Sequence, residues 1–253
     1  MNIEGLNVVV TGGASGLGRA CVDHILENGG TVTVLDRDPD GERVIAELGD
    51  RARYAAADVT RPEEVGRALD LAEQAGPIRA LIHCAGRGGP LRILDRLGQP
   101  GDLSVFEEVV RVNLVGAFNV LRLTAARMAT NDLLEGDRGT CILTASVAAF
   151  EGQIGQAPYA SSKAGVVGMT IVAARDLAQR QIRVCTIAPG IFDTPMLAKV
   201  SAEAREGLAK TMPHPQRLGT GAEFAALAGH IIKNGMLNGE TIRLDGALRM
   251  APR

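Results

Sequence analysis

Short apolar runs alternate with longer amphipathic stretches along the chain, and this alternation constrains the fold more than any other feature. Seven runs of strand length are rich in Val, Ile and Leu: LNVVVTG, TVTVLD, RYAAAD, RALIHCAG, GTCILTAS, IRVCTIAPG and GETIRLDG. All but the third, weaker run read as strands buried on both faces of a sheet. Helical patterns separate them at roughly 16–28, 40–48, 62–75, 104–131, 158–180 and 222–233.

This order of elements predicts an α/β fold with a parallel seven-stranded sheet and helices on both faces. Right-handed crossovers favour the doubly wound (Rossmann) topology, in which ligands bind at the carboxyl ends of the strands. With 253 residues and 46% hydrophobic content, the chain suits one core, and we expect a single domain over 1–253. The Gly- and Pro-rich loop 87–103 and a mobile-looking lid at about 191–215 both follow strands and could border a site.

Composition argues against several classes of partner. The net charge is -2 and the basic residues are scattered, so we expect no binding of nucleic acid or of an anionic membrane. No apolar run approaches the length of a membrane span, and the first apolar strand begins too early for a signal peptide, which predicts a cytoplasmic protein. The histidines form no metal-binding cluster, and we expect no metal. The cysteines are far apart in apolar contexts and read as reduced core residues: Cys21, Cys84, Cys141 and Cys185.

A glycine-rich loop, TGGASGLG, follows the first strand directly. Gly12, Gly16 and Gly18 are spaced G-x-x-x-G-x-G, which is wider than the G-x-G-x-x-G dinucleotide fingerprint. The physical argument still holds, because glycine lets the backbone approach a pyrophosphate and a helix beginning near Ser15 supplies N–H donors. A glycine loop alone would equally serve as a turn, so its context must decide.

That context is a second strand ending in Asp36, eighteen residues after Gly18. A carboxylate here can accept hydrogen bonds from an adenosine ribose and repel a 2′-phosphate, which favours NAD over NADP. Arg37 could instead partner such a phosphate, or be a solvated arginine at the strand end. Asp58 and Val59, after the third strand, could flank adenine, although an aspartate there also serves as a helix cap.

The stretch SVAAFEGQIGQAPYASSKAG places Ser146, Tyr159 and Lys163 within one segment. Residues four apart share a helix face, so Tyr159 and Lys163 project together if a helix begins at Pro158. Lowering the pKa of a tyrosine from about 10 to ~7 requires roughly 4 kcal/mol. A lysine ammonium at ~4 Å supplies about that much at an effective dielectric near 20, so we expect Lys163 to acidify Tyr159. Ser146, at a strand end, can bond the same substrate oxygen.

Taken singly, each of these residues can be explained without a catalytic role: as a buried serine cap, an amphipathic tyrosine and a solvent-facing lysine. Together, behind a dinucleotide loop, they indicate proton transfer beside hydride transfer.

The ordered motifs TGGASGLG, CAG at 84–86, Asn113 in RVNLVGAFNV, Ser146, YASSK and APG at 188–190 resemble the short-chain dehydrogenases/reductases over essentially the full length. The stretches RVCTIAPGIFDTP and LNGETIRLDGALRM are similar, more narrowly, to the type II (short-chain) 3-hydroxyacyl-CoA dehydrogenases. The family often has asparagine before CAG, where this chain has His83, and that asparagine mainly supports the sheet near the cofactor.

The resemblance implies an NAD-dependent oxidoreductase that interconverts a secondary alcohol and a ketone, usually as a homotetramer. It implies a catalytic tetrad of Asn113, Ser146, Tyr159 and Lys163, in which Asn113 anchors a water that relays protons to Lys163. The expected cofactor contacts are Gly12, Ser15, Gly16, Leu17, Gly18, Asp36, Asp58, Val59, Cys84, Ala85, Gly86, Tyr159, Lys163, Pro189, Gly190, Ile191, Phe192 and Thr194.

For the substrate, we expect a 3-hydroxyacyl-CoA or a hydroxysteroid in contact with Ser146, Tyr159 and, from the intervening loop, Gln153 and Gln156. Loop polarity alone would also explain the two glutamines. An apolar wall with basic residues suits an acyl chain with a phosphate-bearing handle, although a plain amphipathic lid helix explains the same residues: Ile191, Phe192, Met196, Leu197, Val200, Lys199, Arg205 and Lys210. The alternatives are an NADPH-dependent 3-oxoacyl reductase of lipid synthesis and a non-catalytic dinucleotide-binding subunit.

Overall fold

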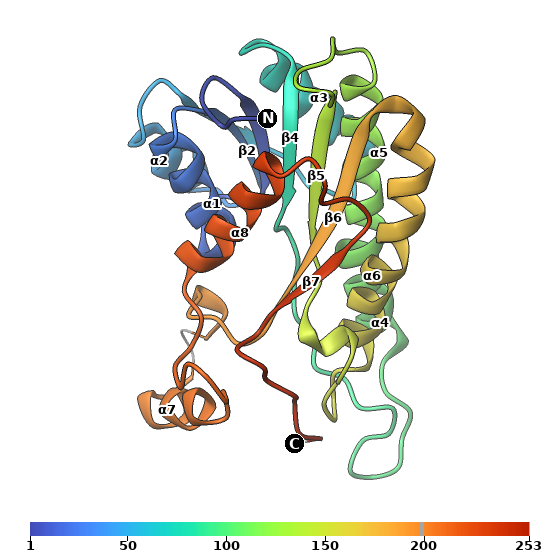
Figure 1. Cartoon of the computed structure of the whole chain (residues 1–253). Coiled ribbons are helices and arrows are strands. Elements are labelled where there is room, and N and C mark those ends of the chain that lie inside the picture. Colours follow the sequence, from blue (N-terminus) through green and yellow to red (C-terminus); the bar gives the residue numbers. More distant parts are fainter. Residues whose placement is uncertain (198–199, 253) are drawn as a thin grey trace.

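The computed structural model describes residues 1–197 and 200–252, and a seven-stranded parallel sheet forms its centre (Figure 1). The strand order is β3-β2-β1-β4-β5-β6-β7, so the chain reverses its winding direction between β1 and β4. This confirms the predicted doubly wound topology, and it places the switch point where such folds bind ligands. The strands are β1 (Asn7–Thr11), β2 (Thr31–Asp36), β3 (Ala52–Ala56), β4 (Ile78–His83), β5 (Gly139–Thr144), β6 (Ile182–Pro189) and β7 (Thr241–Leu244).

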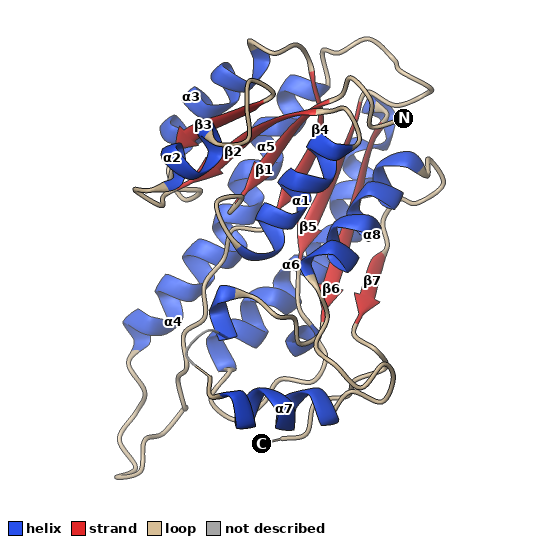
Figure 2. Cartoon of the chain, turned by 90° about the vertical axis from the view of Figure 1, so that its left-hand side faces the viewer, coloured by secondary structure: helices blue, strands red, loops and turns tan. Residues whose placement is uncertain are grey.

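Helices cover both faces of the sheet, as Figures 1 and 2 show. One layer contains α1 (Gly16–Glu27), α2 (Gly41–Ala46) and α8 (Gly221–Lys233). The other contains α3 (Pro62–Glu73), α4 (Leu103–Val110), α5 (Gly116–Met128) and α6 (Ala157–Leu177). As right-handed crossovers require, the helices of the β1–β2 and β4–β5 connections lie on opposite faces, whereas α8, between β6 and β7, packs against α1 in the first layer.

The core consists of two apolar clusters separated by the sheet. Val8 and Val10 of β1 pack on the side of α1 and α8, whereas Val9 between them packs with the α3 and α5 layer. Successive side chains of a strand point to opposite faces of the sheet. Because helices cover both faces, every residue of β1 is buried. The expectation that the seventh strand is also buried was wrong: all four residues of β7 are half-exposed, because β7 is an edge strand with a single neighbour.

The helix predicted at 104–131 is one helical run with a π-helical segment, Arg111–Val115, between α4 and α5. Within the part of the chain that the structure describes, this run of Leu103–Met128 is long and apolar enough to cross a membrane, contrary to the sequence-based expectation. In this fold, 56% of its most apolar window is buried. Its apolar composition is therefore that of a helix packed into a core beside a sheet.

Two segments extend beyond the carboxyl ends of the strands, at the lower edge of Figure 1. Residues 87–102 form the predicted long loop, which is joined to the loop before α6 by a hydrogen bond from Leu91 N to Gly155 O (2.8 Å). The predicted lid contains a helix, α7 (Ala202–Lys210), whose N-terminus is capped by the Ser201 side chain. Ala198 and Lys199, which belong to the predicted lid, lie outside the described residues.

Candidate active site

The glycine loop forms a cradle that side chains would fill. A Cβ on Gly12, whose φ is +67°, would lie 2.8 Å from the backbone nitrogen of Ala85, and one on Gly18 would lie 2.2 Å from the Gly12 carbonyl oxygen. Both contacts are shorter than real Cβ atoms make, so these positions require glycine. Ser15 begins α1 with an extended backbone and makes no capping hydrogen bond, which leaves its hydroxyl and the first N–H groups of α1 free for an anion.

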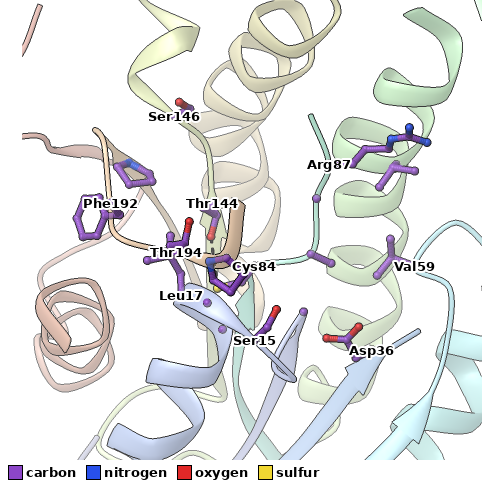
Figure 3. Close-up of a pocket in the computed structure, with 18 of the residues that line it drawn as sticks. Ser15, Leu17, Asp36, Val59, Cys84, Arg87, Thr144, Ser146, Phe192 and Thr194 are labelled. Carbon is purple, nitrogen blue, oxygen red and sulfur yellow. Dashed lines mark hydrogen bonds between the residues drawn. The ribbon is translucent and has the colours of Figure 1, made fainter. Parts of the chain in front are cut away.

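A cavity of about 390 Å³ lies over this loop at the carboxyl ends of the strands, with Ser15 and Asp36 toward one end and Ser146 toward the other (Figure 3). Every residue assigned to the cofactor from sequence lines this cavity, including Gly190, Ile191 and Thr194 after β6. The glycine cradle, the open helix N-terminus and the elongated cavity fit a dinucleotide. Leu197 of the predicted apolar wall also lines the cavity, and sequence reasoning missed further lining residues, most of which adjoin predicted ones: Leu35, Ala57, Arg87, Val112, Thr144, Ala145 and Pro195.

Asp36 is oriented by the backbone around it. One carboxylate oxygen accepts a hydrogen bond from Ala14 N (3.0 Å), and the other accepts from Arg37 N (2.8 Å) and Asp38 N (3.2 Å). These bonds hold the negative charge beside the glycine loop, and Arg37 lines the cavity next to it. The carboxylate therefore lies where the sequence placed a ribose contact.

Asp58 does not cap α3, whose N-cap is Arg61, but orders the turn before that helix. Its Oδ1 accepts hydrogen bonds from Thr60 N (2.8 Å) and Thr60 Oγ1 (2.7 Å), so the side chain closes the turn before α3. Burial raises the pKa of Asp58, but the Thr60 hydrogen bonds outweigh it and hold the pKa below its ordinary value. The residue also lines the cavity beside Val59, as predicted.

Tyr159 and Lys163 lie one turn apart on α6, and Ser146 follows β5 at the start of a short 3₁₀ helix, Val147–Ala149. The Ser146 hydroxyl accepts a hydrogen bond from Ala148 N (3.2 Å). Lys163 is only 5% exposed, and its Nζ donates to the Thr144 carbonyl oxygen at 2.7 Å. All three side chains line the cavity, and Lys163 points into the protein instead of into solvent.

The electrostatics of this group differ from the sequence-based expectation. The Lys163 Nζ lies 5.9 Å from the centroid of the Tyr159 ring. Burial raises the pKa of Tyr159 above its ordinary value, and the Ser146 hydroxyl lowers it only in part. Burial also lowers the pKa of Lys163 to about 8. The expectation that Lys163 makes Tyr159 acidic was therefore wrong for this structure, because burial raises the pKa of the phenol and the Lys163 charge is not among the influences that lower it.

Asn113 lies in the π-helical segment and is buried. Its Nδ2 donates to Arg87 O (2.9 Å) and Ser162 Oγ (3.1 Å), and its Oδ1 accepts from Arg87 N (2.8 Å). The side chain thus fixes the backbone that follows β4 beside the cavity. Both N–H donors of the amide are used in these bonds and Oδ1 accepts one, and the water-anchoring role implied by the family stays a prediction.

His83 connects the ends of β4 and β1. Its Nδ1 lies 2.8 Å from Thr11 Oγ1, which also accepts a hydrogen bond from Ala85 N (3.2 Å). Burial, together with the nearby Lys163 charge, lowers the pKa of His83 to about 3, so the imidazole is neutral at physiological pH. His83 supports the sheet beneath the cavity, as expected for the family position it occupies.

The structure does not bring Gln153 and Gln156 into the cavity. Gln153 Nε2 donates to Ala251 O (3.0 Å), and Gln156 Oε1 accepts from Gln153 N (3.0 Å), so both bond within the loop and to the C-terminal segment. In the lid, Arg205 pairs with Asp193 and Lys210 with Glu206, which partly neutralises the predicted basic face. Across residues 1–197 and 200–252, no group of three or more His, Cys, Asp or Glu side chains could hold a metal ion.

Cys84 offers a test of the cavity that does not depend on turnover. It is half-buried and lines the cavity, whereas Cys21, Cys141 and Cys185 are buried. Hydrogen bonds from the Cys21 thiol and the Thr144 hydroxyl (3.7 Å) lower the pKa of Cys84. We expect iodoacetamide to label Cys84 first, and saturating NADH to slow this labelling by about tenfold, as read by mass spectrometry. Equal labelling with and without NADH would argue against the cofactor position.

Residues 6–205 match the short chain dehydrogenase family. The chain belongs to this family: it is an oxidoreductase that binds a nicotinamide dinucleotide.

Among its relatives, 3-hydroxyacyl-CoA dehydrogenase type-2 of Bos taurus is 48% identical over 255 residues, which cover 99% of this chain and 98% of the relative. A solved structure of 3-hydroxyacyl-CoA dehydrogenase type-2 from Mycobacterium avium is 43% identical, with a TM-score of 0.95 and 98% of each chain covered. The 3-ketoacyl-(acyl-carrier-protein) reductase from Brucella melitensis, complexed with NADH, is 26% identical, with a TM-score of 0.86 and coverage of 97% and 98%.

Proposed function

We propose that this protein oxidises the 3-hydroxyl of a 3-hydroxyacyl-CoA to the 3-oxo thioester with NAD as hydride acceptor, and runs the reverse reduction with NADH. The observation that carries the proposal is the convergence of Ser146, Tyr159 and Lys163 on one cavity with the glycine loop. The substrate class is supported by the near full-length similarity to 3-hydroxyacyl-CoA dehydrogenases type-2. Hydroxysteroids are a second candidate class, because their secondary alcohols need the same chemistry.

The nicotinamide dinucleotide supplies the hydride acceptor or donor when bound. Tyr159 exchanges the proton of the substrate oxygen, and burial, which raises the pKa of its phenol, keeps it protonated, the form that ketone reduction uses. The bond from Ala148 N fixes the Ser146 hydroxyl beside Tyr159, where it can bond the same substrate oxygen. Lys163, with its pKa near 8, changes charge close to physiological pH and can exchange protons in either direction.

The direct experiment is to incubate the pure protein with NAD and a panel of 3-hydroxyacyl-CoAs and hydroxysteroids, and to follow the absorbance of reduced cofactor. Oxidation of the acyl-CoAs supports the proposal, and the order of rates gives the preferred chain length. Preference for NADPH and a 3-oxoacyl substrate on an acyl carrier would instead indicate a reductase of lipid synthesis. Cofactor binding without turnover of any alcohol would indicate a non-catalytic subunit.

Asp36 gives a prediction about cofactor choice. We expect Asp36→Asn to reduce the ratio of kcat/KM for NADH to kcat/KM for NADPH by about 10- to 100-fold, since it removes a charged hydrogen-bond acceptor and a repulsive charge. Parallel assays with the two reduced cofactors measure the ratio. A wild-type protein that uses both cofactors equally would contradict the NAD assignment.

Arg37 is the matched control because it lines the cavity beside Asp36 with the opposite charge. Arg37→Ala should leave the kcat/KM for NADH within about twofold and lower any residual use of NADPH. A large loss of NADH turnover in this variant would show that the arginine, and not the aspartate, binds the adenosine end.

The proposed assembly is a homotetramer. Exposed apolar side chains on the π-helical segment Arg111–Val115, on α5 and on α6 support it: Val115, Phe118, Ile171 and Val172 are each more than 40% exposed. An apolar face of this kind is typical of a subunit interface, and light scattering of the purified protein measures the mass of the assembly.

A further inference from the structure

The loop between Ser146 and Tyr159 carries both proton-handling side chains at its ends, so its position decides whether they meet. It lies against residues 251–252, and two hydrogen bonds join them: Ile154 N donates to Pro252 O (3.0 Å), and the Gln153 side chain donates to Ala251 O (3.0 Å). Both are single hydrogen bonds between uncharged groups. A stronger attachment lies nearer the serine.

That attachment is an ion-pair cluster around Arg243 of β7. Its guanidinium binds both carboxylate oxygens of Glu151, at 2.7 and 2.8 Å, and its Nε donates to Asp245 Oδ2 at 2.7 Å. It also stacks 5.0 Å from the centroid of the Phe150 ring and donates to Leu248 O (2.9 Å). Paired bonds of this kind fix direction as well as distance, and Arg243 is only 19% exposed, so solvent screens them weakly.

The same cluster touches the other side of the cavity. Asp245 lies against Gly190, where a Cβ would approach the Asp245 Cα and Cβ to 3.0 Å, and Gly190 lines the cavity. The next residue, Gly246, accepts a hydrogen bond from His214 N (3.3 Å) at the end of the lid. Arg243 binds the serine loop directly through Glu151, and it binds Asp245, which lies against the end of β6 and precedes the residue that bonds the end of the lid.

We infer that Arg243 is a positioning residue, which through Glu151 and Asp245 holds the Ser146 loop in register with the cavity wall at Gly190. It touches neither the reacting atoms nor the cavity. This inference rests on the proposed function only in that Ser146 and Tyr159 must meet at one substrate oxygen. A displacement of reacting groups by about 1 Å costs on the order of 100-fold in rate, so a loosened loop should reduce kcat.

The test compares Arg243→Gln, Arg243→Lys and Glu151→Gln in the full-length protein. We expect Arg243→Gln to lower kcat by about 10- to 100-fold, with the NADH dissociation constant changed by less than about twofold. Lysine keeps the positive charge but cannot make the two parallel hydrogen bonds to the Glu151 carboxylate, so Arg243→Lys should recover kcat only in part. The fold-decrease in kcat of the double variant Arg243→Gln/Glu151→Gln should be smaller than the product of the fold-decreases of the two single variants.

Hydrogen exchange of peptides from 147–156 supplies a readout without any substrate: it should rise in Arg243→Gln. Arg127→Gln is the matched control, because Arg127 is 22% exposed and pairs with two carboxylates, Asp70 and Glu73, on the α3 and α5 side. It should leave both kcat and the exchange of 147–156 unchanged. Thermal melting identifies any variant that fails to fold, in which case Glu151→Gln and Arg243→Lys carry the test.

The outcomes separate this inference from the proposed function. A wild-type protein that oxidises none of the alcohols refutes the proposed function. An active wild type with kcat and loop exchange unaltered in Arg243→Gln overturns the role of Arg243 alone, as does a uniform rise in exchange over the whole chain, which would indicate a general structural role.

Discussion

Replacing Tyr159 with phenylalanine is expected to lower kcat for alcohol oxidation by about 10²- to 10⁴-fold, the contribution typical of one acid–base group. The substitution removes only the phenol oxygen, so the ring still packs on α6 and the cavity keeps its shape. The NADH dissociation constant, measured by fluorescence, should therefore stay within about twofold of the wild-type value. Steady-state oxidation of the best 3-hydroxyacyl-CoA measures kcat.

Tyr54 provides the control, as the other of the two tyrosines. Its hydroxyl donates to the carbonyl oxygens of Asp36 (2.9 Å) and Asp38 (2.6 Å), at the end of the cavity away from Ser146. Tyr54→Phe should keep kcat within about threefold at saturating cofactor. Undiminished oxidation by Tyr159→Phe would remove Tyr159 from proton transfer and with it the proposed mechanism.

Lys163 sets the expected pH dependence. Burial lowers its pKa to about 8, so the amine is charged below that pH and neutral above it. A neutral amine can receive, through a hydrogen-bonded relay, the proton that Tyr159 takes from the alcohol, whereas an ammonium can resupply that proton during reduction. We therefore expect kcat/KM for oxidation to rise with pH through about 8, and kcat/KM for ketone reduction to fall over the same range.

Lys163→Met should remove this inflection and lower kcat by on the order of 100-fold. Methionine fills the buried space but leaves Thr144 O without its 2.7 Å donor, so the free energy of unfolding should also fall, by about 1–3 kcal/mol. Lys233→Met, on the exposed end of α8, is the control and should keep the wild-type pH profile. An unchanged inflection in Lys163→Met would assign the titration to another group.

Local pattern predicted most of the architecture because the physical causes are local. A strand buried on both faces must be a continuous apolar run, and a helix that begins at Pro158 must place Tyr159 and Lys163 on one face. The glycine positions were equally readable, since a cradle without Cβ atoms can be built only from glycine. Every residue that the sequence assigned to the cofactor also lines the cavity.

The incorrect predictions concern features that depend on contacts between residues far apart in the sequence. β7 was predicted to be a buried strand like β6, but its place at the sheet edge leaves all four of its residues partly exposed. Gln153 and Gln156 precede Tyr159 in the chain, yet the loop turns them toward each other and the C-terminal segment. The helical run Leu103–Met128 is long and apolar enough to cross a membrane, but more than half of its most apolar window is buried inside the fold.

By itself, the sequence determined the doubly wound sheet, the glycine cradle and the spacing of the serine, tyrosine and lysine. Tertiary structure alone decided the charge balance of that group, because desolvation depends on what surrounds a side chain: it raises the pKa of Tyr159 and brings that of Lys163 to about 8. It also decided the link between Arg243 and Glu151, which are 92 positions apart in sequence. Only folding brings such residues within hydrogen-bonding distance, so no local pattern contains the contact.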